Sequence, residues 1–230
     1  MNSFRPLITR LHPYATSAFG LGGIFFTGSR KASTNTTKYI LRSPPPTASR
    51  EVPTALVFLS ASGWDEDSEK GMTSFASMLA EKGYTCLEID LAKPESPSTS
   101  EALMHHFEEE LRSHIRLAAI PFAPVIVSRS TGSLIAQTYI SSNPARGLIM
   151  ISPPPNNRTL AESLLPTPLE EFNYEPKFPI AIVGKKGELE TWRKASRLGQ
   201  DGRVDVFEVD DNEGQDALYR MEVWMDEIGV

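Results

Sequence analysis

A single serine offers the clearest chemistry in this sequence. Residues 127–133 read Val-Ser-Arg-Ser-Thr-Gly-Ser, directly after the apolar run 124–127 and directly before an apolar helical segment. A strand, a sharp turn and a helix in this order lift the central residue, Ser130, above a sheet. Small neighbours suit such a turn because its backbone is strained and crowded. The pattern predicts a nucleophilic serine at position 130.

A base for that serine is missing from the expected part of the chain. A serine hydroxyl is a weak nucleophile at neutral pH and needs an adjacent group to accept its proton. No histidine follows Ser130; the four in the chain are His12, His105, His106 and His114. His105 and His106 are placed early in a predicted helix, where they would have to reach over the turn. Surface or half-buried helical histidines are the simpler interpretation.

Carboxylates are the remaining candidates for the other catalytic roles. Glu188, with Glu190 as second choice for the acid, follows an apolar strand that ends at Val183. Asp210 or Asp211, before the last helix, could replace the missing base. A carboxylate with a pKa near ~4 is a weaker base than imidazole and needs burial to raise that value. The alternative is that these acids only stabilise the positive ends of helix dipoles. Both interpretations remain open.

Short apolar runs alternate with amphipathic segments along the chain, which is typical of a doubly wound, mostly parallel α/β sheet covered by helices on both faces. The predicted strands are 37–41, 55–59, 84–91, 125–127, 147–151, 180–183 and 204–209. The predicted helices are 69–82, 99–118, 133–141, 188–198 and 216–228. Residues 153–179 hold seven prolines and little periodicity, so we expect a loop or a reduced lid.

This order of elements resembles the α/β-hydrolase superfamily. The segment Ser128-Arg129-Ser130-Thr131-Gly132 is similar to the family's nucleophile elbow, and the segment 75–90 to its helix–Gly-Tyr–strand–Asp sequence. The resemblance implies an oxyanion hole formed by the backbone N–H of Thr131 and one N–H from Ser62, Gly63 or Trp64. It also implies an acid after the strand that ends at Val183, where Glu188 lies.

The family's histidine belongs to the loop before the last helix, and here that loop, residues 209–215, contains none. Two functions therefore remain open. The first is a pseudoenzyme that has lost catalysis and binds a small acyl-type molecule or a protein partner. The second is a nonstandard serine ester or thioester hydrolase that uses Ser130, with Glu188 and Asp211 as its acid and base. No metal-binding or phosphate-binding motif is present, so no cofactor is expected.

Charge divides the chain into two parts. Residues 1–50 carry five arginines and two lysines with no acid, whereas the other 180 residues carry 16 basic and 29 acidic side chains. An Arg-bearing, Ser-rich, acid-free segment with apolar residues at helical spacing is typical of a mitochondrial transit peptide. We expect residues 1–35 to be that presequence, or else a disordered basic tail, and residues 36–230 to be an α/β-hydrolase-like domain of the mitochondrial matrix.

The composition also excludes several functions. The acidic main part lacks the basic footprint that nucleic-acid binding needs. No apolar run approaches the roughly 18–20 residues that span a bilayer. The lone Cys86 excludes an internal disulfide, and its position within an apolar strand predicts a small buried side chain.

Overall fold

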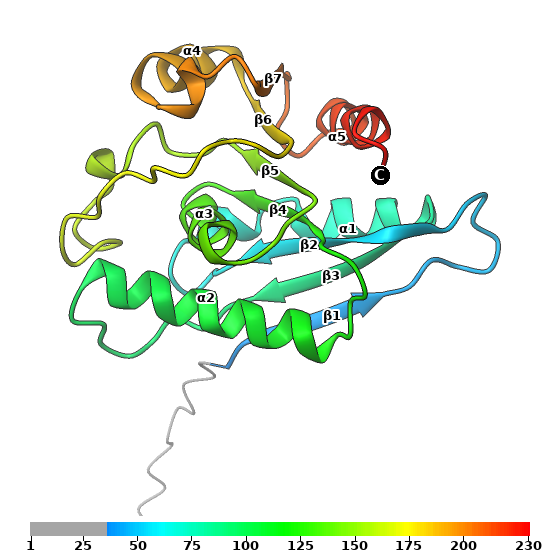
Figure 1. Ribbon diagram of the computed structural model, residues 1–230, viewed down its shortest axis with the longest axis horizontal. Helices are drawn as coiled ribbons and strands as arrows, with labels where there is room; N and C mark the ends of the chain where they lie inside the picture. Colours follow the sequence, from blue (N-terminus) through cyan, green and yellow to red (C-terminus); the bar gives the residue numbers. More distant parts are fainter. Residues whose placement is uncertain (1–35) are drawn as a thin grey trace, which may run out of the picture. The chain divides into compact units, whose positions relative to one another are not determined.

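The predicted apolar runs form the strands of one mostly parallel sheet (Figure 1). The computed structural model describes residues 36–230; the predicted presequence, residues 1–35, lies outside them. Strand order is β1-β3-β2-β4-β5-β6-β7, and only β1 runs antiparallel to its neighbour. The strands are β1 Lys38–Arg42, β2 Val52–Ser60, β3 Tyr84–Asp90, β4 Val125–Arg129, β5 Gly147–Ile151, β6 Ile180–Gly184 and β7 Val204–Glu208.

Helices cover both faces of this sheet, as the sequence predicts. The helices are α1 Met72–Glu81, α2 Ser100–Leu117, α3 Gly132–Ser142, α4 Lys186–Ala195 and α5 Gln215–Glu227. Along β2, Val57 and Leu59 join the apolar cluster under α2, α3 and α4, whereas Leu56 and Phe58 join the cluster under α1 and α5. Successive strand residues point to opposite faces, so one strand supplies both cores.

The start of the first helix differs from the prediction of 69–82. A separate 3₁₀ turn, Glu66–Glu69, precedes α1, which begins only at Met72. Gly71 separates the two with a φ of 77°. Glycine adopts this left-handed conformation without steric cost, so it breaks a run that looks continuous in the sequence. The 3₁₀ turn matters because its capping residue, Asp65, lies beside the elbow.

The proline-rich segment between β5 and β6 carries only one short 3₁₀ turn, Asn157–Thr159, in agreement with the predicted reduced lid. Hydrogen bonds hold this segment against the helices: the Ser100 amide donates to Thr167 Oγ1 at 2.9 Å, and the Thr167 amide donates to Ser100 Oγ at 3.1 Å. The segment is therefore tied to the start of α2.

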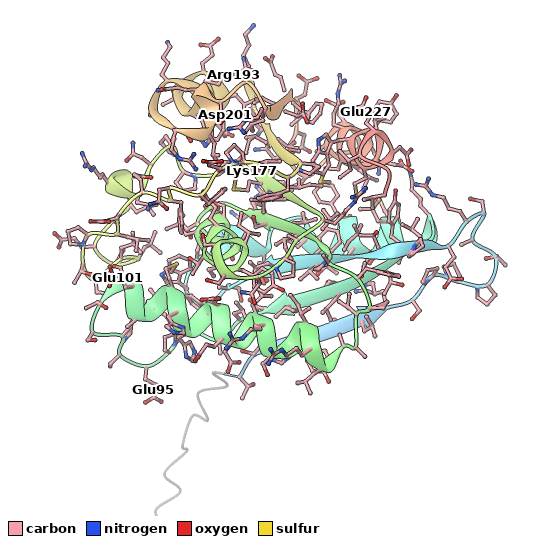
Figure 2. The ribbon with its side chains drawn as sticks, viewed as in Figure 1. Glu95, Glu101, Lys177, Arg193, Asp201 and Glu227 are labelled. Carbon is pink, nitrogen blue, oxygen red and sulfur yellow. The ribbon has the colours of Figure 1, made fainter. Side chains whose placement is uncertain are left out.

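The outer surfaces of the helices are charged. Figure 2 shows the side chains of Glu101 on α2, Arg193 on α4 and Glu227 on α5 pointing away from the sheet. Among the helices of residues 36–230, none combines the length and the apolar character needed to cross a membrane.

Candidate functional site

The elbow predicted around Ser130 is formed in the structure. Ser130 follows β4 and has a φ of 50°, a conformation that is strained for any residue other than glycine. Its amide donates to the Ile151 carbonyl at 3.0 Å, and its own carbonyl accepts from Ser133 Oγ at 2.7 Å. Helix α3 starts two residues later. These bonds lock the strained turn onto β5 and α3.

Ser130 lies in the wall of a cavity of about 600 Å³ at the carboxyl ends of β4, β5 and β6. This is the edge where open α/β sheets bind ligands. The wall combines polar side chains with a ridge of three consecutive prolines and a tryptophan. It comprises Asp67, Arg129, Ser130, Ser152, Pro153, Pro154, Pro155, Gly187, Glu188, Thr191, Trp192 and Asn212.

Glu188, the predicted acid, belongs to a small hydrogen-bond network in the cavity wall. Ser152 Oγ donates to Glu188 Oε2 at 2.8 Å, and Asn212 Nδ2 donates to Ser152 Oγ at 2.6 Å. Asn212 is buried, and its Oδ1 has no hydrogen-bond partner among the described residues. Glu188 itself is exposed and sits in the first turn of α4, which also fits the helix-dipole interpretation.

Asn212 occupies the loop in which the α/β-hydrolase family carries its histidine. The predicted substitute base, Asp211, is exposed and is absent from the cavity wall; its Oδ1 instead accepts from the Glu213 amide at 3.1 Å. The three described histidines all lie on α2, outside the cavity wall. Within residues 36–230 the Ser130 hydroxyl has no hydrogen-bond partner. Among the described residues, no side chain therefore lies within hydrogen-bond distance to take its proton.

The main donor of the predicted oxyanion hole is already occupied. The Thr131 amide donates to Asp65 Oδ2 at 3.0 Å, and the Thr131 hydroxyl donates to the same oxygen. Asp65 Oδ1 accepts from the Asp67 amide at 3.1 Å, which caps the 3₁₀ turn. A carboxylate of the chain itself thus sits where a reacting oxyanion would bind.

The loop after β2 repeats this arrangement. The Ser62 amide and hydroxyl donate to the two oxygens of Asp90, each at 2.7 Å. The Trp64 amide donates to the Ala61 carbonyl at 2.8 Å. Of the four predicted hole donors, only the Gly63 amide has no acceptor within residues 36–230. Ligand binding by the Ser62 and Thr131 amides requires displacement of these two carboxylates.

The Trp64 side chain anchors the loop rather than facing the cavity. It is 6 % exposed, its indole N–H donates to the Leu164 carbonyl at 2.8 Å, and its ring lies 5.3 Å from that of Phe107. It thereby fixes the proline-rich segment against α2. Its contacts are those of a core residue.

The one cation in the cavity wall is also committed. Arg129 donates to the Lys70 carbonyl at 3.0 Å and pairs with Glu213 at 2.9 Å. Asp67, also in the wall, pairs with Lys70, whose hydrogen bond lowers the pKa of the Asp67 carboxyl. Nowhere in residues 36–230 do three or more His, Cys, Asp or Glu side chains gather in a geometry suited to a metal ion.

Sequence reasoning missed three residues of this site: Asp65, Ser152 and Asn212. Asp65 had a usable signal, because an aspartate before a short polar run is a common helix cap. Ser152 lies directly after β5 with a φ of 45°, and no pattern in the sequence predicts this conformation. Asn212 is adjacent to the predicted Asp211 in sequence, but Asn212 lines the cavity and Asp211 does not.

Comparisons with known proteins identify the fold. The chain matches no protein-family model, and its sequence matches no curated protein. An α/β-hydrolase from the sediment metagenome of the Mar Chica lagoon is 14 % identical, with 83 % of this chain and 95 % of that one covered and a TM-score of 0.56. A thermophilic esterase of Thermogutta terrifontis is 15 % identical, with 84 % and 88 % covered and a TM-score of 0.60.

A serine hydrolase without a lid from Xanthomonas campestris is similar as well, at 12 % identity, with 84 % of this chain and 87 % of that one covered and a TM-score of 0.55. Residues 36–230 therefore have the α/β-hydrolase fold, with a seven-stranded, mostly parallel sheet between two helical layers. At these identities the likeness establishes the fold and leaves the chemistry to the site itself.

Proposed function

We propose that this chain is a catalytically degenerate protein of the α/β-hydrolase fold that binds an acyl-type small molecule in the cavity beside Ser130. One observation carries the proposal: Ser130 lines a cavity of about 600 Å³, yet within residues 36–230 its hydroxyl has no hydrogen-bond partner that could take its proton. Such a cavity is large enough for a small ligand. A serine without a base remains a poor nucleophile.

The occupied oxyanion position supports the same proposal. Stabilisation of a developing oxyanion by preorganised N–H donors is a large part of acyl-transfer catalysis, and loss of one donor costs about 10²–10³ in kcat. Here the Thr131 amide donates to Asp65 and the Ser62 amide to Asp90. A tetrahedral intermediate on Ser130 would meet a carboxylate where it needs a donor. The proposal therefore rests on two features, the missing proton acceptor for Ser130 and the occupied donors of the oxyanion hole.

An acyl-type ligand fits the apolar part of the cavity. Pro153, Pro154, Pro155 and Trp192 offer a surface for a short hydrocarbon chain, with polar groups at one end. The similar esterase of Thermogutta terrifontis has been solved with propionate and with butyrate bound. Short acyl compounds are therefore the first ligands to test here.

A fluorophosphonate probe tests the loss of catalysis. The full-length protein and its Ser130→Ala variant would be incubated with excess probe for hours, and the adduct followed by intact mass. We expect no stoichiometric adduct on Ser130, because the serine has no base within hydrogen-bond distance among the described residues and the Thr131 and Ser62 amides already donate to Asp65 and Asp90. A full adduct that disappears in the variant would instead establish the second function, a nonstandard ester or thioester hydrolase.

We further propose that residues 1–35 direct the protein to mitochondria. The proposal rests on the basic, acid-free composition of this segment and on the apolar residues at helical spacing near its start. The test is a fusion of residues 1–35 to a fluorescent protein, compared with the same fusion carrying Arg5→Glu and Arg10→Glu. Mitochondrial fluorescence that the charge reversals abolish is the expected result, and diffuse fluorescence of the unmodified fusion would contradict it.

A further inference from the structure

We propose that the cavity beside Ser130 selects acyl compounds with an uncharged, hydrogen-bond-donating head, that is carboxamides, over free carboxylates. The inference rests on the proposed binding function and names the ligand class for it. It is based on the charges of the cavity wall and on the hydrogen-bond donors and acceptors of the wall that have no partner.

The charges of the wall disfavour a carboxylate. Asp67 and Glu188 both line the cavity, and Arg129 is the one cation that residues 36–230 place in its wall. The guanidinium of Arg129 already donates to the Lys70 carbonyl and pairs with Glu213. An anionic ligand would therefore face two carboxylates and no uncommitted cation. Removing its charge from water under those conditions is unfavourable.

An unused acceptor on Glu188 favours a ligand that donates. Asn212 Oδ1 also lacks a partner, but it is buried and is not counted as an acceptor for the ligand. Glu188 Oε2 accepts from Ser152 and from Asn212, whereas its Oε1 accepts from no group in residues 36–230. A ligand N–H group can donate to the exposed Glu188.

Two donors remain for the ligand's carbonyl. Ser130 and Trp192 both line the cavity, and within the described part of the chain neither the Ser130 hydroxyl nor the Trp192 indole N–H has an acceptor. A carboxamide carries a carbonyl oxygen and N–H groups on one carbon, so it can use both kinds of free group. The proline ridge accommodates its hydrocarbon chain. An ester supplies only the carbonyl, and a carboxylate supplies neither a donor nor a neutral head.

Three ligands of one chain length separate these contributions. Hexanamide is neutral with donors, methyl hexanoate is neutral without donors, and hexanoate is charged without donors. Dissociation constants would be measured for the full-length protein at pH 7 by ligand-observed NMR titration. We expect hexanamide to bind at least about 10-fold more tightly than hexanoate, with methyl hexanoate between them, because each hydrogen bond contributes up to about one order of magnitude.

Two variants assign the effect to this cavity. Glu188→Gln keeps an acceptor for Ser152 but removes the charge, so the preference for hexanamide over hexanoate should fall at least about 3-fold. Gly187→Leu should weaken all three ligands, because Gly187 lines the cavity and has open space where a side chain would begin. Gly202→Leu is its matched control: Gly202 has the same open space but lies outside the cavity wall.

The outcomes separate this inference from the function on which it rests. Equal or tighter binding of hexanoate, or equal binding of the amide and the ester, would overturn the selectivity while acyl binding stands. Binding that Gly187→Leu leaves unchanged would place the ligand elsewhere and overturn the inference. Absence of binding by all three ligands would refute the proposed function as well.

Discussion

The two sides of the candidate site treat their hydrogen-bonding groups in opposite ways. On the elbow side, formed by residues 60–67 with Ser130 and Thr131, backbone donors are satisfied by Asp65 and Asp90 of the same chain. On the α4 side, formed by Ser152, Glu188 and Asn212, acceptors are left without donors. The Thr131 and Ser62 amides of the first side are used by internal contacts, whereas the second side keeps an exposed carboxylate, Glu188, with one oxygen that accepts from no described group.

Under the proposed loss of catalysis, the two sides of the site would have lost their catalytic groups in independent ways. The elbow side keeps the strained turn at Ser130. Asp65 accepts hydrogen bonds from Thr131 there and so holds the loop in place, where an anion would otherwise bind. The α4 side keeps an acid in place but offers it Asn212 instead of an imidazole. Restoring one side alone should therefore leave the serine inactive.

The largest expected effect comes from restoring both sides. Asn212→His supplies an imidazole beside Glu188, and Asp65→Ala frees the Thr131 amide. We expect the double variant to label with a fluorophosphonate at least about 10²-fold faster than Asn212→His alone, since one oxyanion donor is worth about that factor. Labelling rates by intact mass, with Ser130→Ala added as control, test this. Equal rates for the single and double variants would show that Asp65 does not block the hole.

The elbow side should also show its structural role in stability. Asp65→Ala removes the acceptor of the Asp67 amide and of the Thr131 amide and hydroxyl, and Thr131 is 4 % exposed. Leaving buried donors unpaired predicts a loss of about 2–3 kcal/mol in the free energy of unfolding. Urea denaturation of wild type and variant measures it. A loss below about 1 kcal/mol would mean that water replaces the carboxylate without penalty.

The α4 side should tolerate truncation better. Asn212→Ala removes a buried carbonyl oxygen that has no partner, together with an amide group that donates to Ser152. The gain from the first change offsets the loss of the second, so we expect a stability change within about 1 kcal/mol. The same urea series checks this. If Asn212→Ala costs as much as Asp65→Ala, the contrast between the two sides is refuted.

The sequence predicted the frame because each strand and helix carries its own periodicity. The strands that flank the elbow, β4 and β5, were placed with errors of at most two residues, since apolar runs between turn residues are locally encoded. The helix predicted at 69–82 was too long because Gly71 breaks it with a left-handed conformation. Such breaks depend on φ, which composition does not reveal.

The sequence predicted the site residues that are neighbours along the chain, but not those that only folding brings together. Ser130 and Thr131 are neighbours in sequence, and the elbow pattern located both. Asp65 reaches Thr131 across 66 positions, and Asn212 reaches Ser152 across 60, so no local pattern reports either contact. Whether a donor is free or occupied is a property of the folded loops, and residue types alone cannot give it.

The smallest expected effect concerns Asp67, which lines the cavity beside Asp65 but is exposed. Its ion pair with Lys70 lowers the pKa of its carboxyl below the usual value of 3.8. A lowered pKa means that the ionised form stabilises the fold above pH 3.8, and this contribution disappears as pH falls through the folded-state value. Because exposed pairs are weak, Asp67→Ala should lower the free energy of unfolding by less than about 0.5 kcal/mol at pH 7 and by nothing measurable at pH 2.

Urea titrations at both pH values measure this loss, with Asp65→Ala in parallel. A cost at pH 7 that matches Asp65→Ala would show that the elbow side is held by its surface charges rather than by the buried contacts of Thr131.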